Sequence, residues 1–198
     1  MIYAIATADL QPTAAANVQQ AAEVVVAAFR GQVHGWQTLD AALEEVQESF
    51  GEGRLSLVAL DATGRVVGWI GGVRQYEGHT WELHPLAVHP DTQGHGVGRA
   101  LVTALEDRVR ALGGRNLWLT TDDGRDLTNL DGVDLYPTVI DHLRTLRDTG
   151  GHPITFYKKC GFTVTGVIPD AYAPGHHELV LAKRLVGERR WEVQTHLL

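Results

Sequence analysis

Two side chains that can take up a proton, Glu82 and His84, lie two residues apart in the segment WELHPLAV, residues 81–88. The segment alternates as a half-buried strand does, and this predicts that Glu82, His84 and Leu86 share one face of it. The other face would carry Trp81, Leu83 and Pro85. A carboxylate or imidazole placed in this way can remove the proton that an attacking amine must lose. Spacing alone also allows an ion-pair role for Glu82 and a hydrogen-bonded strand position for His84.

A glycine pattern, Q-x-x-G-x-G, follows this segment at Gln93, Gly96 and Gly98. The glycines lie at the start of a predicted amphipathic helix, where unpaired backbone N–H groups and the helix dipole favour phosphate. The pattern therefore predicts a pyrophosphate-binding loop. The helix is predicted from apolar residues at helical spacing: Val97, Leu101, Leu105, Val109 and Leu112.

Other chemistry is disfavoured by the residues present. The loop lacks the lysine and the spacing of the G-x-x-x-x-G-K-[ST] motif. Cys160 is the single cysteine, which excludes an internal disulfide and a cysteine-based zinc site, and no base stands beside it in sequence to make it a nucleophile. His176 and His177 would alternate across a strand and so cannot easily share one ion. We expect no metal.

Charge and composition limit the partners. The chain has 198 residues, 44% of them apolar, and a net charge of −7. Seven aspartates and three arginines fall within residues 122–148, and such a segment repels nucleic acid and attracts cations. The N-terminus lacks the features of a signal peptide, and no apolar run approaches the roughly 20 residues of a membrane span. We expect a cytoplasmic protein that binds neither nucleic acid nor membrane.

The length fits one domain over residues 1–198, and the helices and strands predicted within it place it in the α+β class. Helices are predicted over 17–30, capped by Asn17, and over 38–50, capped by Thr38. Further helices are expected over 97–112, 133–148 and 153–160, and strands over 54–60, 65–76, 79–88, 116–121, 161–168 and 176–185.

Two local features stand out between these elements. Gly68, Gly71 and Gly72 are unusual inside a strand and indicate a bulge or a close approach by another backbone or a ligand. Trp36, in the loop between the first two helices, would either anchor this loop or line a substrate wall.

The strand ending in LAV-HP, the glycine pattern and the G-R-A-L that follows resemble the acetyl-CoA pyrophosphate loop of the GNAT superfamily of N-acetyltransferases. The predicted order of elements also matches the GNAT fold, and this resemblance implies a central mixed sheet flanked by helices. The segments QY…WELHPLAV, LTTDD, HPITFYKKCGF and GVIPDA further resemble aminoglycoside 6′-N-acetyltransferases, over about residues 75–185. The resemblance implies an antibiotic-resistance enzyme that moves acetyl from acetyl-CoA to the 6′-amine of a polycationic aminoglycoside by direct attack. It also implies a homodimer.

The resemblance implies roles for individual residues. Glu82 and His84 would face the 6′-amine, and Tyr157 would protonate the departing thiolate, although without the family Tyr157 is more simply a core aromatic residue. The acetyl-CoA site would comprise Leu86, Ala87, Val88, Gln93, Gly94, His95, Gly96, Val97, Gly98 and Arg99. The acceptor site would comprise Tyr76, Glu82, Asp122, Asp123 and Glu178.

The chain departs from the family pattern in two places. Few basic residues occur in the loop, which leaves Arg99 and His95 to assist the pyrophosphate. The family's P-D-[IL]-W segment is replaced by HHEL at 176–179, so Glu178 is expected to stand in for the missing carboxylate.

Three points stay open on the sequence. The tail over 187–198, which contains Trp191, is a candidate dimer contact. The acceptor is alternatively another amine, such as a polyamine or a protein N-terminus. A non-catalytic acyl-CoA sensor is the alternative of a different class.

Overall fold

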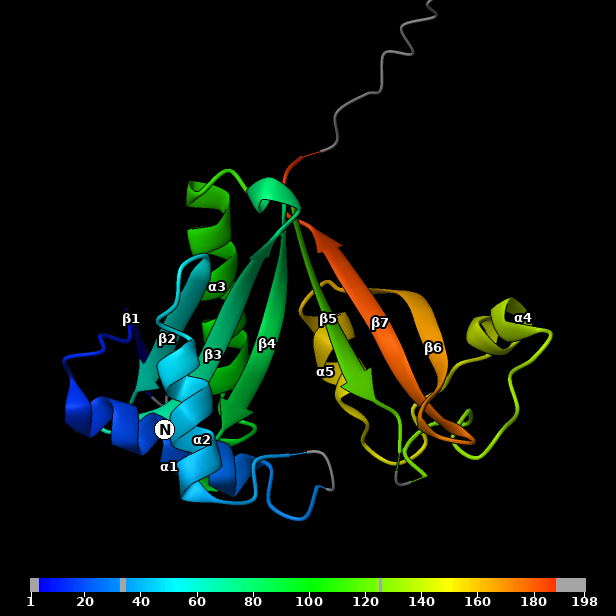
Figure 1. The fold of residues 1–198 in the computed structure, drawn as a ribbon, viewed down its shortest axis with the longest axis horizontal. Coiled ribbons are helices and arrows are strands. Elements are labelled where there is room, and N and C mark those ends of the chain that lie inside the picture. The colour runs from blue at the N-terminus through cyan, green and yellow to red at the C-terminus, as the bar shows by residue number, and fades with distance from the viewer. Residues whose placement is uncertain (1–3, 33–34, 125, 188–198) are drawn as a thin grey trace, which may run out of the picture.

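The computed structural model describes residues 4–32, 35–124 and 126–187. Strands of the described chain form one mixed seven-stranded sheet in the order β1-β2-β3-β4-β5-β7-β6 (Figure 1). Neighbouring strands are antiparallel except β4 and β5, which are parallel. The bounds are β1 (Ala6–Asp9), β2 (Arg54–Leu60), β3 (Val66–Gln75), β4 (Thr80–Val88), β5 (Asn116–Asp122), β6 (Thr163–Ala173) and β7 (His176–Arg184).

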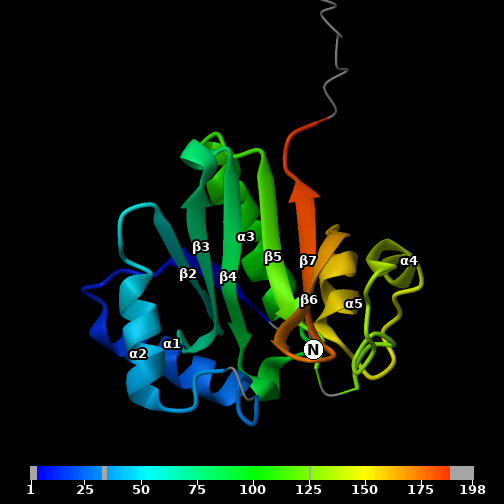
Figure 2. The same cartoon turned by 45° about the vertical axis from the view of Figure 1, so that its right-hand side comes forward.

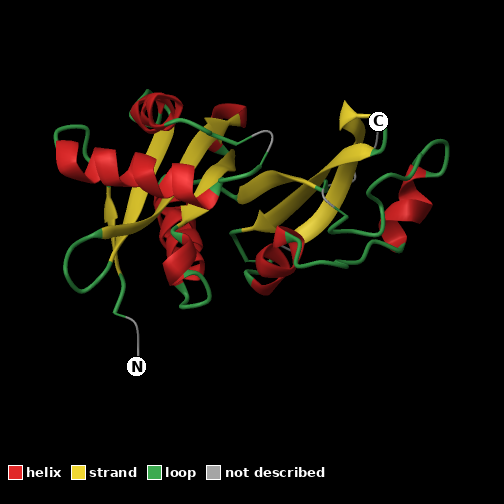
Figure 3. Ribbon diagram, turned by 90° about the horizontal axis from the view of Figure 1, so that it is seen from below, coloured by secondary structure: helices red, strands yellow, loops and turns green. Residues whose placement is uncertain are grey.

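Helices lie on both faces of the sheet (Figures 1 and 3). One face carries α1 (Ala15–Ala28) and α2 (Leu39–Glu48), and the other carries α3 (Val97–Ala111) and α5 (Pro153–Lys159). At the end of the molecule, α4 (Val139–Arg144) lies near β6, and short 3-10 turns, η1 (Tyr76–Gly78) and η2 (Pro90–Thr92), precede and follow β4. The predicted mixed α+β architecture is confirmed. Figure 2 shows that α1 and α2 cover only the β2–β4 side, so no described helix covers that face of β5, β7 and β6.

Two apolar cores hold these layers together. On one face, Leu101 and Leu105 of α3 pack with Trp81 of β4. On the other face, Val25 of α1 packs with Trp69 of β3. Burial of one such side chain stabilises the fold by about 1.5–3 kcal/mol, so the sheet is a firm support for groups along β3 and β4.

Close approach of α3 explains two of the strand glycines. A Cβ at Gly68 would lie 2.8 Å from the Leu101 side chain, and a Cβ at Gly72 would lie 2.8 Å from the Leu105 side chain. Glycine at both positions lets α3 lie close to β3. The nearest atoms belong to leucine side chains, and not to the backbone or ligand that was predicted there.

Helix bounds agree with the prediction at α2 and differ at α1. Thr38 caps α2 by accepting a hydrogen bond from the backbone N–H of Ala41, 3.2 Å away. Asn17 was predicted to cap the first helix, and this is wrong, because α1 begins at Ala15 after the N-cap Ala14.

The second half of the chain brings other corrections. In place of the predicted helix over 133–148, the structure has only the short helix α4. Pro137 explains the later start, because the residue before a proline disfavours the helical conformation. Strand β6 extends to Ala173, beyond the predicted end at residue 168. Strand β1 was missed because it has only four residues, most of them exposed, and none of them is a large apolar residue.

Some predictions concern residues that the structure does not describe. Trp191 and nearly all of the tail over 187–198 lie outside the described ranges, so the dimer contact stays a prediction. Among the described helices, none has the length and apolar character needed to cross a bilayer. The described part of the chain contains no group of three or more His, Cys, Asp or Glu side chains placed to hold a metal ion.

Candidate active site

A bulge in β4 sets the geometry of the site. Pairing advances by two residues on β3, from Ile70 to Gly72, but by three on β4, so His84 and Pro85 together oppose Gly71. The His84 carbonyl oxygen approaches so closely that a Cβ on Gly71 would lie 2.2 Å from it. The predicted bulge is confirmed, and Gly71 is glycine because no side chain fits there.

This bulge corrects the predicted faces of β4. An extra residue shifts the alternation of a strand, so residues beyond it change face. Leu86 packs on the α3 side, in the core that contains Trp81, and does not share a face with Glu82. The next residue, Ala87, is buried on the α1 side against Trp69.

Beyond Glu82, β4 and β5 separate. The two strands pair only over Thr80–Glu82 and Asn116–Trp118, and then diverge (Figure 1). After Glu82, β4 continues to pair with β3, but its other edge has no strand partner among the described residues. Leu86, Ala87 and Val88, which were predicted to contact acetyl-CoA, lie on this edge. Unpaired N–H and C=O groups on a strand edge can bind an extended ligand.

Two hydrogen bonds in series hold Glu82 at the start of this opening. Trp118 Nε1 donates to Gln75 Oε1 over 3.1 Å, and Gln75 Nε2 donates to Glu82 Oε2 over 2.7 Å. All three side chains are partly buried. Sequence reasoning missed Gln75 and Trp118, because their contacts depend on the register of three strands.

His84 lies at the exposed side of the bulge, next to an aromatic pair. The Trp36 ring centroid is 5.9 Å from that of His84. Trp36 also packs edge-on against Phe29 at the end of α1, with a centroid distance of 5.0 Å. Trp36 therefore anchors its loop, and it also borders His84.

Acidic side chains lie on the face of β5, β7 and β6 that no described helix covers, which we call the open face. Asp122 of β5 and Glu178 of β7 are directly opposite each other on adjacent strands. Tyr172 of β6 donates a hydrogen bond to Glu178. Burial, this hydrogen bond and the neighbouring carboxylates raise the pKa of Tyr172. Like charges directly opposite each other repel, so a cation would be favoured there.

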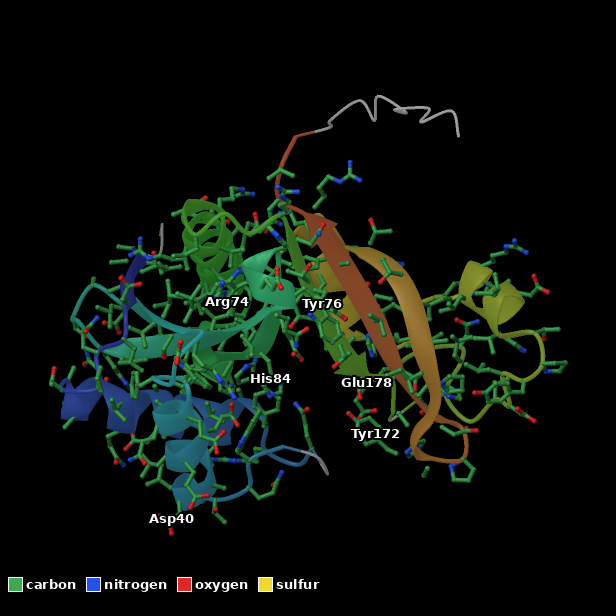
Figure 4. The ribbon with its side chains drawn as sticks, turned by 45° about the horizontal axis from the view of Figure 1, so that its top comes forward. Asp40, Arg74, Tyr76, His84, Tyr172 and Glu178 are labelled. Atoms are coloured by element: carbon green, nitrogen blue, oxygen red, sulfur yellow. The ribbon has the colours of Figure 1, made fainter. Side chains whose placement is uncertain are left out.

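The labelled side chains of Figure 4 show how these groups are distributed. His84 comes from the α1–α2 half, while Glu178 and Tyr172 come from the β6–β7 half. Tyr76 lies in the turn between β3 and β4, where its side chain is 75% exposed.

Asp123 does not face this space, although it was predicted to bind the acceptor. Its side chain is fully buried and accepts hydrogen bonds from the His177 N–H over 3.1 Å and from the Thr128 hydroxyl over 3.2 Å. Burial raises its pKa. Direct contact with an acceptor is therefore excluded in this conformation, and Asp123 instead ties the loop after β5 to β7.

The glycine loop forms an open backbone site at the start of α3. Gly94 and Gly96 have φ angles of 76° and 90°, and nothing lies within 4 Å of either Cβ position. The backbone N–H groups from Gly96 to Arg99 donate no backbone hydrogen bond within the described ranges. These groups at a helix N-terminus are suited to bind phosphate.

Other residues in and next to the loop make contacts that shape this site. Gln93 donates from its side chain to the Val88 carbonyl oxygen over 3.2 Å. His95 Nδ1 lies 2.9 Å from the Gln93 carbonyl oxygen, and Val97 is buried beneath the loop. Gly98 lies close to α5, since a Cβ at this position would be only 3.1 Å from the ring of Phe156.

A cavity of about 210 Å³ adjoins Arg99, in the first turn of α3. Arg99 and Lys159 are both exposed there. The buried carboxylate of Glu106 forms ion pairs with Lys183 and Arg110. A basic residue from α5 thus joins the few cations near the loop. The cavity is lined by Arg99, Val102, Thr103, Glu106, Lys159, Cys160 and Lys183.

Tyr157 has a buried ring that packs edge-on with Phe156 and Phe162, at centroid distances of 5.1 and 5.7 Å. Its core position is therefore confirmed. Burial raises its pKa, so the hydroxyl stays protonated. Burial also raises the pKa of Cys160, which disfavours the thiolate that a nucleophile needs.

His152 fixes the helix that carries Tyr157. Its Nδ1 accepts from the Ile154 N–H over 3.0 Å, so its proton lies on Nε2, which donates to the Asp122 carbonyl oxygen over 2.8 Å. Burial lowers the pKa of His152 and keeps the ring neutral. Pro153 at the first helical position signals where α5 begins, but neither the cap by His152 nor its link to β5 was predicted.

Comparison with protein families agrees with this geometry. The model of the acetyltransferase (GNAT) family matches residues 23–136. The chain belongs to the GNAT acetyltransferase family. An acetyltransferase of Photorhabdus laumondii is 38% identical over 74 residues, which are 37% of this chain and 50% of that protein. The chain thus aligns with about half the length of this curated relative.

Solved structures match over nearly the whole chain. An aminoglycoside 6′-N-acetyltransferase complexed with coenzyme A is 29% identical, with a TM-score of 0.85 over 93% of this chain and 99% of that one. The aminoglycoside 6′-N-acetyltransferase from Enterococcus faecium is 28% identical, with a TM-score of 0.84 over the same shares, 93% and 99%. The GNAT fold predicted from the sequence is confirmed.

Proposed function

We propose that this chain transfers the acetyl group of acetyl-CoA to the 6′-amine of an aminoglycoside. The position of Glu82 carries the proposal: it is the last residue of β4 that pairs with β5, so a hydrogen-bonded carboxylate borders the point where the strands open. The free edge of β4 and the glycine loop follow it along the chain. Similarity to two aminoglycoside 6′-N-acetyltransferases supports the choice of acceptor.

The residues around the opening fit acetyl-CoA. A phosphate group can approach Gly94 and Gly96, because no atom lies within 4 Å of their Cβ positions. The backbone N–H groups from Gly96 to Arg99 would bind its oxygens, and the guanidinium of Arg99 adds positive charge. The edge from Leu86 to Val88, apart from the Val88 carbonyl oxygen that Gln93 engages, would hold the pantetheine chain by main-chain hydrogen bonds. Bound there, acetyl-CoA supplies an activated acetyl thioester.

Two proton transfers fall to this chain's own side chains. An amine with a pKa of about 10.4 is neutral in only about one molecule in a thousand near pH 7.4, a deficit of roughly 4 kcal/mol. Glu82 or His84, directly or through water, would take the proton that the amine loses. Tyr157 would give its proton to the sulfur that leaves. Its buried ring and the His152 cap keep this hydroxyl in place.

Charge on the open face fits a polycationic acceptor. Asp122 and Glu178 lie opposite each other on adjacent strands, and an ammonium group between them would relieve their repulsion. Glu82 would bind the ammonium group nearest the reaction. Tyr76 and Trp36 offer ring faces at the edges of this space, where a sugar ring can pack.

A panel of amines tests the proposal. The purified chain is mixed with acetyl-CoA and with aminoglycosides that bear a 6′-amine, spermidine, or peptides with a free N-terminus, and thiol release is measured. We expect the fastest release with the aminoglycosides. Faster release with spermidine or a peptide would keep acetyl transfer and reject the aminoglycoside. Binding of CoA without release for any amine would favour the non-catalytic sensor.

A further inference from the structure

We propose that Gln75 is a positioning residue that aims the Glu82 carboxylate at the acceptor amine. This inference rests on the proposed function. Gln75 ends β3, opposite Thr80 at the start of β4. Its amide lies between Trp118 Nε1, 3.1 Å from Oε1, and Glu82 Oε2, 2.7 Å from Nε2.

The indole determines which way the Gln75 amide points. An indole N–H only donates a hydrogen bond, and an ionised carboxylate only accepts one. An amide between these two groups is satisfied in one orientation, with its oxygen toward Trp118 and its NH₂ toward Glu82. The flipped amide would set NH₂ against N–H and oxygen against carboxylate. Trp118 therefore ensures that Gln75 donates to Glu82.

This donation determines what Glu82 offers to an amine. Oε2 is engaged by the amide, so the carboxylate cannot rotate freely, and Oε1 is left for the acceptor's proton. A base held in one geometry removes a proton more efficiently than one that has to be oriented in each turnover. Trp118, Gln75 and Glu82 form a hydrogen-bonded relay. The three strands that supply it meet where β4 and β5 still pair, before they diverge. The relay thus stands on the continuous part of the sheet.

Gln75→Met tests the relay kinetically, because it removes the amide and keeps the length of the side chain. We expect kcat with an amine acceptor to fall about tenfold, the value of one charge-assisted hydrogen bond, and the KM for acetyl-CoA to stay unchanged. Gln19→Met is the matched control. It removes the exposed hydrogen bond of 3.2 Å from Gln19 to Glu23 on α1 and should leave kcat unchanged. A wild-type kcat for Gln75→Met would overturn the inference.

A spectroscopic readout does not depend on acetyl transfer. The indole N–H resonance of Trp118, assigned with Trp118→Phe, reports the relay. Glu82→Gln should move this resonance when Gln75 is present and leave it in place in the Gln75→Met background. Equal movement in both backgrounds would overturn the inference. If the coupling is present and no amine is acetylated, the proposed function fails, while the orientation of Glu82 by Gln75 stands.

Discussion

Gly71 of β3 lies against the carbonyl oxygen of His84 in β4, 2.2 Å from where a Cβ would stand. Gly71→Ala should therefore push β4 away and lower the free energy of unfolding by about 1–3 kcal/mol, as overpacking does. Urea unfolding measures this change. Gly166→Ala is the control in β6, since its nearest neighbour, Val180, would be 3.8 Å away, and we expect a change within about 0.5 kcal/mol. Equal effects would show that the contact does not hold the bulge.

Gly96→Val tests the phosphate loop. A branched side chain at Gly96 would block the approach of a phosphate group, so the Kd for acetyl-CoA should rise at least about tenfold, or 1.4 kcal/mol, in a calorimetric titration. Gly113→Val is the matched control, because Gly113 also has a positive φ, 83°, and open space around its Cβ position, but lies at the other end of α3. Equal loss of affinity in both variants would attribute the effect to backbone strain.

Asp122→Asn tests the acidic side of the acceptor site. Loss of one charged contact should raise the KM for the acceptor about tenfold, leave the KM for acetyl-CoA nearly unchanged, and have a smaller effect at high salt. The buried neighbour offers a direct comparison: Asp123→Asn keeps a hydrogen-bond acceptor for His177 and should leave the acceptor KM unchanged. Steady-state kinetics at two salt concentrations measures both. A rise with Asp123→Asn alone would reverse the assignment.

Asp148 gives a pH dependence to the start of α5. Hydrogen bonds from the Thr155 hydroxyl and from the backbone N–H groups of His152, Gly151 and Gly150 lower its pKa from 3.8 to about 2. Because the pKa is lower in the folded state, this stabilisation is complete above about pH 3.8 and is lost as the pH falls through about 2. Asp148→Asn lacks this contribution. As the pH falls from about 3.8 to about 2, the difference in unfolding free energy between wild type and variant should therefore shrink. A difference that stays constant would contradict the assignment.

Sequence patterns correctly predicted the elements whose pattern of burial is contained in a single segment. Alternation located β4, and helical spacing located α3, because each pattern is contained in one segment. Leu86 was placed on the wrong face, because the bulge depends on the contact of Gly71 with His84 from another strand. The Gln75 relay likewise depends on the register between β4 and β5.

The adjacent aspartates show the same limit within one motif. The T-D-D pattern marked both Asp122 and Asp123 as acceptor ligands. Asp123 is buried by contacts with His177, 54 residues away in sequence, and with the nearby Thr128, while Asp122 stays at the surface. The sequence alone does not show how either aspartate side chain is buried or oriented, because both properties depend on the pairing of β5 with β7.

The central claim is that the 6′-amine of an aminoglycoside is the acceptor. It is tested by two aminoglycosides that differ only in an amine or a hydroxyl at the 6′ position, each incubated with the wild-type chain and acetyl-CoA. We expect thiol release only with the amine, a product that NMR shows to be acetylated on the 6′ nitrogen, and slower release with Glu82→Gln. Equal turnover of the two compounds, or an acetyl group on a different nitrogen, would contradict it.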